Sequence, residues 1–231
     1  MPGLSLTPTT TDQIRHMKKQ NKYYLKILAA LTFLAFQVTP LIAQVGAQKN
    51  LINPNVADAE SLQRVKHFTK ESADSLIRGR PYLSLEKLNK HLITEFNSDQ
   101  VKEILSELCI HLNINKADEK SLLLIPKLGP KMAHEVDEYR PYVSFKQFRN
   151  EIGKYVSKTE VARLEQYFFI PIELNEASDE DILTIPGVGK KLLHEFKEYR
   201  PYKSLKQFRK EIGKYVNEIE IKRLERYVTL K

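Results

Sequence analysis

Residues 199–216 read YRPYKSLKQFRKEIGKYV, and residues 139–156 read YRPYVSFKQFRNEIGKYV. The two segments begin 60 residues apart, and the similarity extends well beyond them. An ungapped alignment of residues 113–171 with residues 173–231 contains 30 identities in 59 positions. This degree of identity indicates a duplication, and internal repeats at a fixed period are the signature of repeat architectures. Residues 53–112 form a third and more divergent copy.

The signals within each copy are helical. In the third copy, Ser178 is followed by acidic residues, which is typical of a helix N-terminus. Residues 190–199 carry apolar side chains at three- and four-residue spacing, which predicts an amphipathic helix. Ser204 and Gln207 form the pattern of a capping box that opens a third helix, and a fourth helix follows the turn at Gly213. No segment alternates as a strand would, so the sequence predicts an all-α fold with four short helices per copy.

The positive charge is unevenly distributed. The chain has 37 Lys and Arg against 29 Asp and Glu, a net charge of +8. Residues 1–47 contain five basic residues and one acid, so residues 48–231 keep a net charge of only +4. Within the latter, residues 190–214 hold nine basic and three acidic residues, and residues 127–154 hold six and four. A basic patch of this kind can bind nucleic acid, although helix faces also carry charges that pair with one another.

The composition excludes several classes of protein. A hydrophobic fraction of 42% is ample for a packed core and excludes a disordered chain. A single cysteine, Cys109, excludes a disulfide framework and a cysteine-based zinc site. We expect this thiol to be buried and without a partner cysteine.

The N-terminal segment has the composition of a targeting sequence. A basic stretch precedes the uncharged run ILAALTFLAF at residues 27–36, and Val45 and Ala47 precede Gln48 at the spacing of a cleavage site. Residues 1–47 are therefore predicted to be a signal peptide that is cleaved after Ala47. The alternative is an uncleaved N-terminal membrane anchor, because the apolar run can just reach the length needed to span a bilayer. Both interpretations place residues 48–231 outside the cytoplasm.

The segment Ile185-Pro-Gly-Val-Gly-Lys-Lys191 is the most specific in the chain. Its two glycines permit a tight turn with positive φ, and the turn leads directly into a helix N-terminus. Unpaired amides and the helix dipole favour an anion there, and two lysines stand beside them. Val188, between the glycines, is expected to point into the core. The alternative is a plain connector in which Gly and Pro only end one helix and start the next.

This segment, preceded by LNEAS and followed by YRPYKSLKQF, resembles the helix-hairpin-helix domain of the competence DNA-receptor (ComEA-type) family. All three copies follow the family frame, over roughly residues 51–231. The resemblance implies tandem helix-hairpin-helix (SAM-like) modules at residues 53–112, 113–172 and 173–231, the first of them degenerate. In the family, two pseudosymmetric hairpins per module hold the phosphates of both strands of double-stranded DNA without reading its sequence. In Gram-negative members the domain follows a signal peptide, which implies a periplasmic location here.

The resemblance also assigns DNA phosphate-binding residues by position. In the third copy these are Gly187, Val188, Gly189, Lys190 and Lys191 in the first hairpin, and Gly213 and Lys214 in the second. In the second copy they are Gly129, Lys131, Gly153 and Lys154.

The first two copies depart from the family pattern. The second copy has Lys127 in place of the first glycine, and Pro130 removes one amide from its anion site. The first copy has neither glycine nor proline at residues 65–69, so no phosphate site is expected there.

Enzymatic and metal-binding interpretations are set aside. His134 and His194 are each followed by a glutamate, but the second histidine of a zinc-binding HExxH helix is absent. Lys191 lies where endonuclease III-type DNA glycosylases, which have a similar hairpin, keep a catalytic lysine. Residues 200–216 lack the aspartate that those enzymes also need. The tyrosines beside each Arg-Pro pair are interpreted as packing between helix pairs rather than as platforms for bases.

Two functions follow as hypotheses. The first is an exported, non-enzymatic protein that binds double-stranded DNA without sequence specificity and needs no cofactor. DNA uptake is the process that the resemblance suggests, with envelope or DNA-uptake proteins as further partners. The second is a structural or protein–protein interaction repeat of the cell envelope that has lost most DNA binding. In either case the protein meets a membrane only through its N-terminal segment, which would anchor it to the inner membrane if uncleaved.

Overall fold

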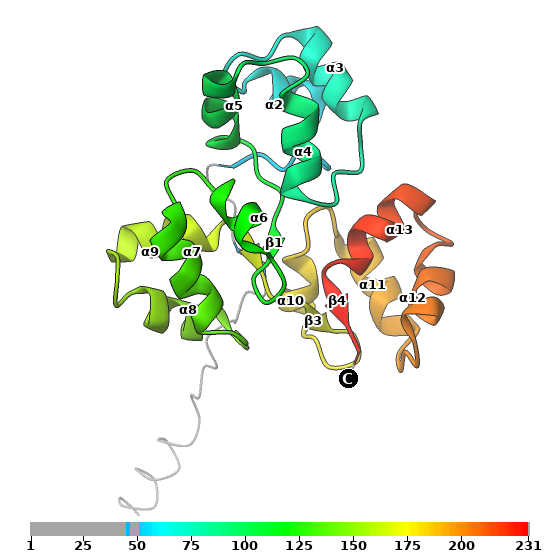
Figure 1. The fold of residues 1–231 in the computed structure, drawn as a ribbon. Coiled ribbons are helices and arrows are strands. Elements are labelled where there is room, and N and C mark those ends of the chain that lie inside the picture. The colour runs from blue at the N-terminus through cyan, green and yellow to red at the C-terminus, as the bar shows by residue number, and fades with distance from the viewer. Residues whose placement is uncertain (1–44, 47–50, 231) are drawn as a thin grey trace, which may run out of the picture. The chain divides into compact units, whose positions relative to one another are not determined.

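The computed structural model describes residues 45–46 and 51–230 (Figure 1). This part of the chain is mostly helical, which confirms the all-α prediction. The first set of four helices is α2 (Ala59–Gln63), α3 (Lys70–Arg78), α4 (Leu85–Leu92) and α5 (Ser98–Leu105). The second set is α6 (Glu119–Leu123), α7 (Gly129–Glu138), α8 (Phe145–Ile152) and α9 (Lys158–Glu165). The third set is α10 (Asp179–Leu183), α11 (Lys190–Glu198), α12 (Leu205–Ile212) and α13 (Glu218–Glu225). We refer to the three sets, with their flanking residues, as the first, second and third repeat.

The predicted leader at residues 1–47 lies outside the described residues, apart from Val45 and Gly46. Among the helices that the structure describes, none is long and apolar enough to cross a membrane.

Local capping sets where the helices begin. Ser178 is the N-cap of α10, as predicted, and exchanges hydrogen bonds with Asp181 in a complete capping box. The Ser204 hydroxyl caps α12 by accepting from the Gln207 amide at 3.1 Å. The Gln207 side chain accepts instead from the backbone of Lys203, so the predicted second half of this box does not form. The reason is local, because the amide one residue before the N-cap is also within reach of the glutamine.

Short parallel strands close each repeat upon itself. Strand β1 (Leu112–Asn113) pairs with β2 (Phe168–Phe169), and β3 (Ile172–Glu173) pairs with β4 (Val228–Thr229). In the first repeat a single bridge joins Ile52 to Leu108 in the same way. The expectation that no segment forms a strand was therefore wrong. Two-residue strands are too short to show alternation in a sequence, and their partners lie at the opposite end of the repeat.

The most conspicuous repeated residues hold the repeat together. In the second repeat, the Asn115 side chain bonds both backbone groups of Tyr142, at 2.8 Å and 2.7 Å. Arg140 donates to the carbonyls of Ile114 and Ala117, each at 2.6 Å. Asparagine–tyrosine and arginine–alanine bonds of the same kind recur in the other two repeats, and all three Arg-Pro peptide bonds are cis. The repeated motifs therefore join the start of each repeat to the corner between its two helix pairs.

The other buried side chains agree with the sequence interpretation. Tyr142 and Tyr202 are 1% and 3% exposed, which confirms that these tyrosines pack within the fold. The half-buried Tyr139 has its hydroxyl 2.8 Å from that of Tyr155. Cys109 is fully buried, as expected. One core cluster extends through the first two repeats, and a second fills the third repeat and includes Val45 and Phe169.

Candidate nucleic-acid interface

The turn between the first two helices has the same backbone conformation at one position of every repeat. Gly187 has a φ of +81°, His67 of +69° and Lys127 of +61°. Only glycine adopts this left-handed region without steric strain. Val188, next to Gly187, is 8% exposed, which confirms that it points into the core. This position of the turn is therefore left-handed in all three repeats, but only in the third does a glycine occupy it.

The last helix of the third repeat supports this turn from behind. Arg223 of α13 is 1% exposed and bonds Glu220 through two nitrogens, at 2.5 Å and 2.8 Å. A Cβ atom on Gly187 would lie 3.1 Å from both the Arg223 Nη2 atom and the Val56 Cγ1 atom. Glycine is thus favoured here by close approach as well as by φ. Sequence reasoning did not identify Arg223, because only folding brings it to the turn.

The N-terminus of α11 has no side-chain cap. Its N-cap is Gly189, with φ −103° and ψ −178°, and no side chain accepts from the first amides of the helix. A Cβ atom at this position would meet nothing within 4 Å, so the space in front of the amides is open. Lys190 and Lys191 are exposed, and neither has an ion-pair partner among the described residues. Free amides, the positive end of a helix dipole and two unpaired ammonium groups together form a site for an anion.

The first repeat closes the equivalent site with its own side chains. Thr69 has nearly the same backbone angles as Gly189, φ −104° and ψ 178°, but forms a complete capping box with Ser72. Glu103 then pairs with Lys66 at 2.7 Å and with His67 at 2.5 Å. The amide of the first turn is occupied, and the Lys66 and His67 side chains both face the Glu103 carboxylate. This geometry favours no phosphate contact in the first repeat.

In the second repeat, the number of groups free to bind an anion is intermediate between those of the other two repeats. Helix α7 begins at Gly129, which has a φ of +69°, and no side chain caps it. Pro130 in the first turn has no amide hydrogen to donate. Lys131 is exposed and without an ion-pair partner among the described residues, as Lys190 and Lys191 are. The site therefore offers fewer donors than the one at α11.

At the second hairpin of the third repeat, the groups that would hold a phosphate already have partners within the chain. The Asn217 side chain caps α13, whose first turn carries Glu218 and Glu220. Lys214 is paired with Glu211 and lies 4.8 Å above the ring of Tyr199, and the Glu211 carboxylate raises the pKa of Lys214. Gly213 has a φ of −62°, and Ile93 stands at the same position of the first repeat with a φ of −67°. The turn therefore has no conformational need for glycine.

The second repeat has the same arrangement. Ser157 caps α9, and Lys154 is paired with Glu151 and lies 4.9 Å above the ring of Tyr139. Gly153 also has a φ of −62°. The predicted phosphate contacts at the second hairpins thus involve lysines that already have partners within the chain.

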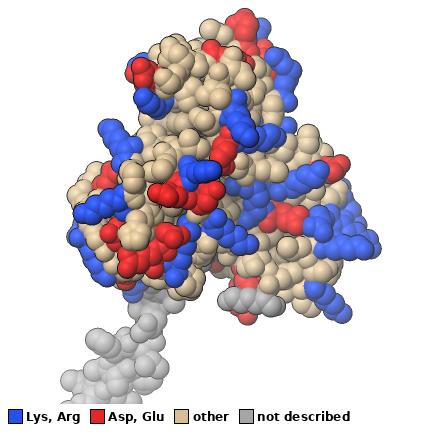
Figure 2. All heavy atoms as spheres, viewed as in Figure 1, with Lys and Arg blue, Asp and Glu red and all other residues tan. Residues whose placement is uncertain are grey.

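Ion pairing reduces the number of basic side chains at residues 190–214 that are free to bind a ligand. Lys197 pairs with Asp179, and Arg209 pairs with Glu225. Lys210 and Lys214 both contact Glu211, and Arg200 donates to a backbone carbonyl. The exposed lysines that remain without an ion-pair partner among the described residues are Lys190, Lys191, Lys203 and Lys206. Figure 2 shows basic side chains gathered over the part of the surface where α11 to α13 lie, with acidic side chains among them.

His134 and His194 lie on helix surfaces. His194 Nε2 is 3.0 Å from Glu198 Oε2, and His134 Nε2 is 3.6 Å from Glu138 Oε2. His194, Glu195 and Glu198 each have one possible metal-ligand atom, and these three atoms lie within 4.8 Å of one another. Both outer residues are more than half exposed and already pair with each other, so the group has the geometry of a surface ion pair.

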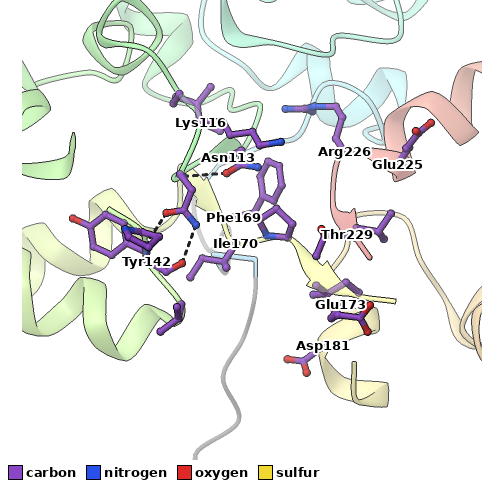
Figure 3. A pocket seen from close by; sticks show the side chains of 18 of the residues that line it. Asn113, Lys116, Tyr142, Phe169, Ile170, Glu173, Asp181, Glu225, Arg226 and Thr229 are labelled. Atoms are coloured by element: carbon purple, nitrogen blue, oxygen red, sulfur yellow. Dashed lines mark hydrogen bonds between the residues drawn. The ribbon is translucent and has the colours of Figure 1, made fainter. Parts of the chain in front are cut away.

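A cavity of about 900 Å³ is lined by residues from all three repeats (Figure 3). Lys116 and Arg226 extend into it beside Phe169, whereas Glu173 and Asp181 lie at its other end. These two carboxylates already accept bonds from nearby backbone amides of the third repeat. Sequence reasoning did not predict this cavity, because no local motif marks residues that meet only when the repeats are packed.

Comparison with known proteins adds no neighbour to this geometry. No protein-family model, curated protein or solved structure matches the chain. The case for a function therefore rests on the residues described above.

Proposed function

We propose that the chain is an exported, non-enzymatic protein that binds double-stranded DNA without sequence specificity through tandem helix-hairpin-helix modules. The main contact is a phosphate held at the start of α11 by backbone amides and by Lys190 and Lys191. The observation that carries the proposal is the uncapped helix N-terminus beside two unpaired lysines. The proposal involves no cofactor and no catalytic residue.

The contacts are ranked by how many donors each turn leaves free. Gly187, Val188 and Gly189 shape the principal site, and Gly129 with Lys131 forms a weaker one. Gly153, Lys154, Gly213 and Lys214 would have to exchange internal partners for phosphates, so the proposal does not depend on them. The expected partners beyond DNA are envelope or DNA-uptake proteins, and the expected location is the periplasm or the inner-membrane surface.

The strength of binding follows from the number of phosphates neutralised. With two to four unpaired lysines, the logarithm of the binding constant should fall with the logarithm of salt concentration with a slope of about −2 to −4. Binding of this kind is weak, with a dissociation constant of roughly micromolar or higher at moderate salt. Such affinity suits a protein that must hold and release DNA of any sequence.

A titration tests the proposal directly. The compact unit Leu41–Lys231 would be mixed with a fluorescent DNA duplex at low and moderate salt. We expect the double variant Lys190→Glu and Lys191→Glu to bind at least about tenfold more weakly. Lys90→Glu with Lys120→Glu is the matched control, because it changes net charge equally at two exposed lysines outside the third repeat.

Two outcomes would count against DNA binding. One is binding that is absent or insensitive to salt, and the other is an equal loss of affinity in both double variants. The second would show that net charge, and not the α11 site, governs the interaction.

The alternative function is a structural or protein–protein interaction repeat of the cell envelope. The closed turn of the first repeat favours it, because Thr69, Ser72 and Glu103 use the groups that an anion would need. A wild-type chain that fails the titration, yet co-purifies with one envelope protein, would support this alternative.

A further inference from the structure

Two residues of the predicted leader lie inside the folded body. Val45 is 3% exposed and belongs to the core cluster of the third repeat, with Phe169, Ile172 and Val228. It forms an antiparallel bridge with Phe169. The Gly46 amide donates to the carbonyl of Phe168 at 3.0 Å. The segment is therefore packed and hydrogen-bonded like the body itself.

Gly46 fits its place only as a glycine. A Cβ atom there would lie 1.9 Å from the carbonyl oxygen of Glu165 and 2.7 Å from its carbonyl carbon. The obstacle is backbone at the end of α9, which cannot swing aside as a side chain could. The backbone at Gly46 is therefore packed too closely against α9 to leave room for a side chain. Such close packing is typical of a segment that belongs to the folded body.

A buried histidine depends on the same segment. His111 is 1% exposed, and its Nε2 atom lies 3.1 Å from the Gly46 carbonyl oxygen. Its other ring nitrogen faces the hydroxyl of Tyr227 at 3.4 Å. Without Gly46 the Nε2 group would lose its acceptor in a buried place, and an unsatisfied buried donor is destabilising.

From these contacts we infer that the mature protein keeps Val45 and Gly46, so the chain is not cleaved after Ala47. The cleavage site favoured by the sequence would remove a core side chain, a strand partner and the acceptor of His111 together. The exported body then begins no later than Val45, either with the leader retained as an anchor or after cleavage at an earlier bond.

This inference rests on the proposed export, and its first test uses the full chain. The chain with a C-terminal tag would be produced in a Gram-negative host, and its N-terminus would be read by intact mass. We expect every product to contain Val45 and Gly46. Ala47→Arg is the matched variant, because a large basic residue blocks cleavage at that bond, and it should have the same N-terminus as the wild type. A wild-type product that begins at Gln48 would overturn the inference.

A second test does not depend on export. In the purified full chain, Gly46→Ala should lower the melting temperature by at least about 4 °C, because the new methyl group meets backbone. Gly189→Ser is the stability control, since a Cβ there would meet nothing within 4 Å and serine is a good N-cap, so it should melt at or slightly above the wild type. Equal melting of Gly46→Ala and the wild type would contradict the docked segment. A DNA titration of the same samples reports on the proposed function separately, because neither result above requires DNA.

Discussion

The turn between the first two helices of each repeat has one residue with positive φ, and this position shows that different residues can occupy the same backbone conformation. His67, Lys127 and Gly187 share this conformation, although two of them have a Cβ atom that opposes it. Tertiary packing, including that of the apolar residue after each left-handed position (Phe68, Leu128 and Val188), holds the backbone in place. Glycine in the third repeat therefore relieves strain and admits Arg223 and Val56, and the turn does not require it in order to form.

We predict opposite effects for reciprocal changes at this position. Gly187→Ala should lower the free energy of unfolding by about 1–2 kcal/mol, from the left-handed φ and the two close contacts. Lys127→Gly should raise it by up to about 1 kcal/mol, because the same strain is removed. Urea unfolding of Leu41–Lys231 measures both, and changes of the same sign would contradict the argument.

His111 should make the protein sensitive to acid. Burial, together with the charges of Arg226 and Arg223, lowers its pKa from 6.5 to about 4, and the hydrogen bond to Gly46 opposes this shift. As the pH falls below about 6.5, His111 therefore becomes protonated in the unfolded chain but stays neutral in the folded chain. Stability should decline between about pH 6.5 and pH 4, by on the order of 3 kcal/mol in total.

The test compares two proteins at two pH values. His111→Gln keeps a side-chain donor for the Gly46 carbonyl but cannot titrate. Its urea midpoint should fall less than that of the wild type between pH 7.5 and pH 4.5, and carboxylates elsewhere affect both proteins equally. Identical pH dependence would show that His111 is not the titrating group.

At the scale of the element, the helices that follow the three first turns differ mainly at their N-termini. Helix α3 is capped by Thr69 and α11 begins at Gly189, although the two N-cap residues have almost the same backbone angles. The same fold can thus satisfy its own amides or leave them for a ligand. One side chain decides between the two.

Reciprocal exchange of the caps should separate stability from binding. Gly189→Ser should raise the free energy of unfolding by a few tenths of a kcal/mol, roughly 0.3, because the hydroxyl caps α11. It should also weaken DNA binding several-fold without changing charge, because the hydroxyl occupies the amides that hold a phosphate. Thr69→Gly should lower stability by about the same few tenths and leave binding unchanged. Fluorescence titration measures DNA binding and urea unfolding measures stability. Wild-type affinity in Gly189→Ser would show that the backbone amides of α11 do not bind the phosphate.

At the scale of the molecule, Phe169 joins two repeats. Its backbone belongs to strand β2 of the second repeat and accepts from the Ile114 amide at 3.1 Å. Its ring belongs to the core of the third repeat, 4.6 Å from the ring of Tyr227, and Arg226 lies 5.7 Å away. The second and third repeats therefore share a side chain and should unfold together.

Removing this ring should both destabilise and uncouple the repeats. Phe169→Ala should lower the free energy of unfolding by about 3–5 kcal/mol, as for other buried aromatic residues. In calorimetry of Leu41–Lys231, we expect the single wild-type transition to split into two. Phe208→Ala is the control, because Phe208 is equally buried but lies within the third repeat, and it should destabilise without the same splitting. A single transition in Phe169→Ala would show that the coupling lies elsewhere.

Much of the fold was predictable because its signals are local. Helical periodicity, the Ser178 cap and the buried position of Val188 each depend on residues a few positions apart. The strand pairs and the partners of Arg223 were not predictable, since each joins residues that are distant in the chain. The candidate site was predictable in part for the same reason, as the Gly-Val-Gly-Lys-Lys turn is local and the ion pairs that neutralise other basic residues are not.

The sequence by itself determined the helical class, the 60-residue period and the one turn with both glycines and two following lysines. These are properties of short segments, which caps, periodicity and glycine specify without reference to the rest of the chain. Only the tertiary structure decided which lysines remain unpaired, that Thr69 closes the first turn, and that Val45 and Gly46 belong to the body. Each of those depends on contacts with residues that folding brings together, and a linear pattern does not contain them.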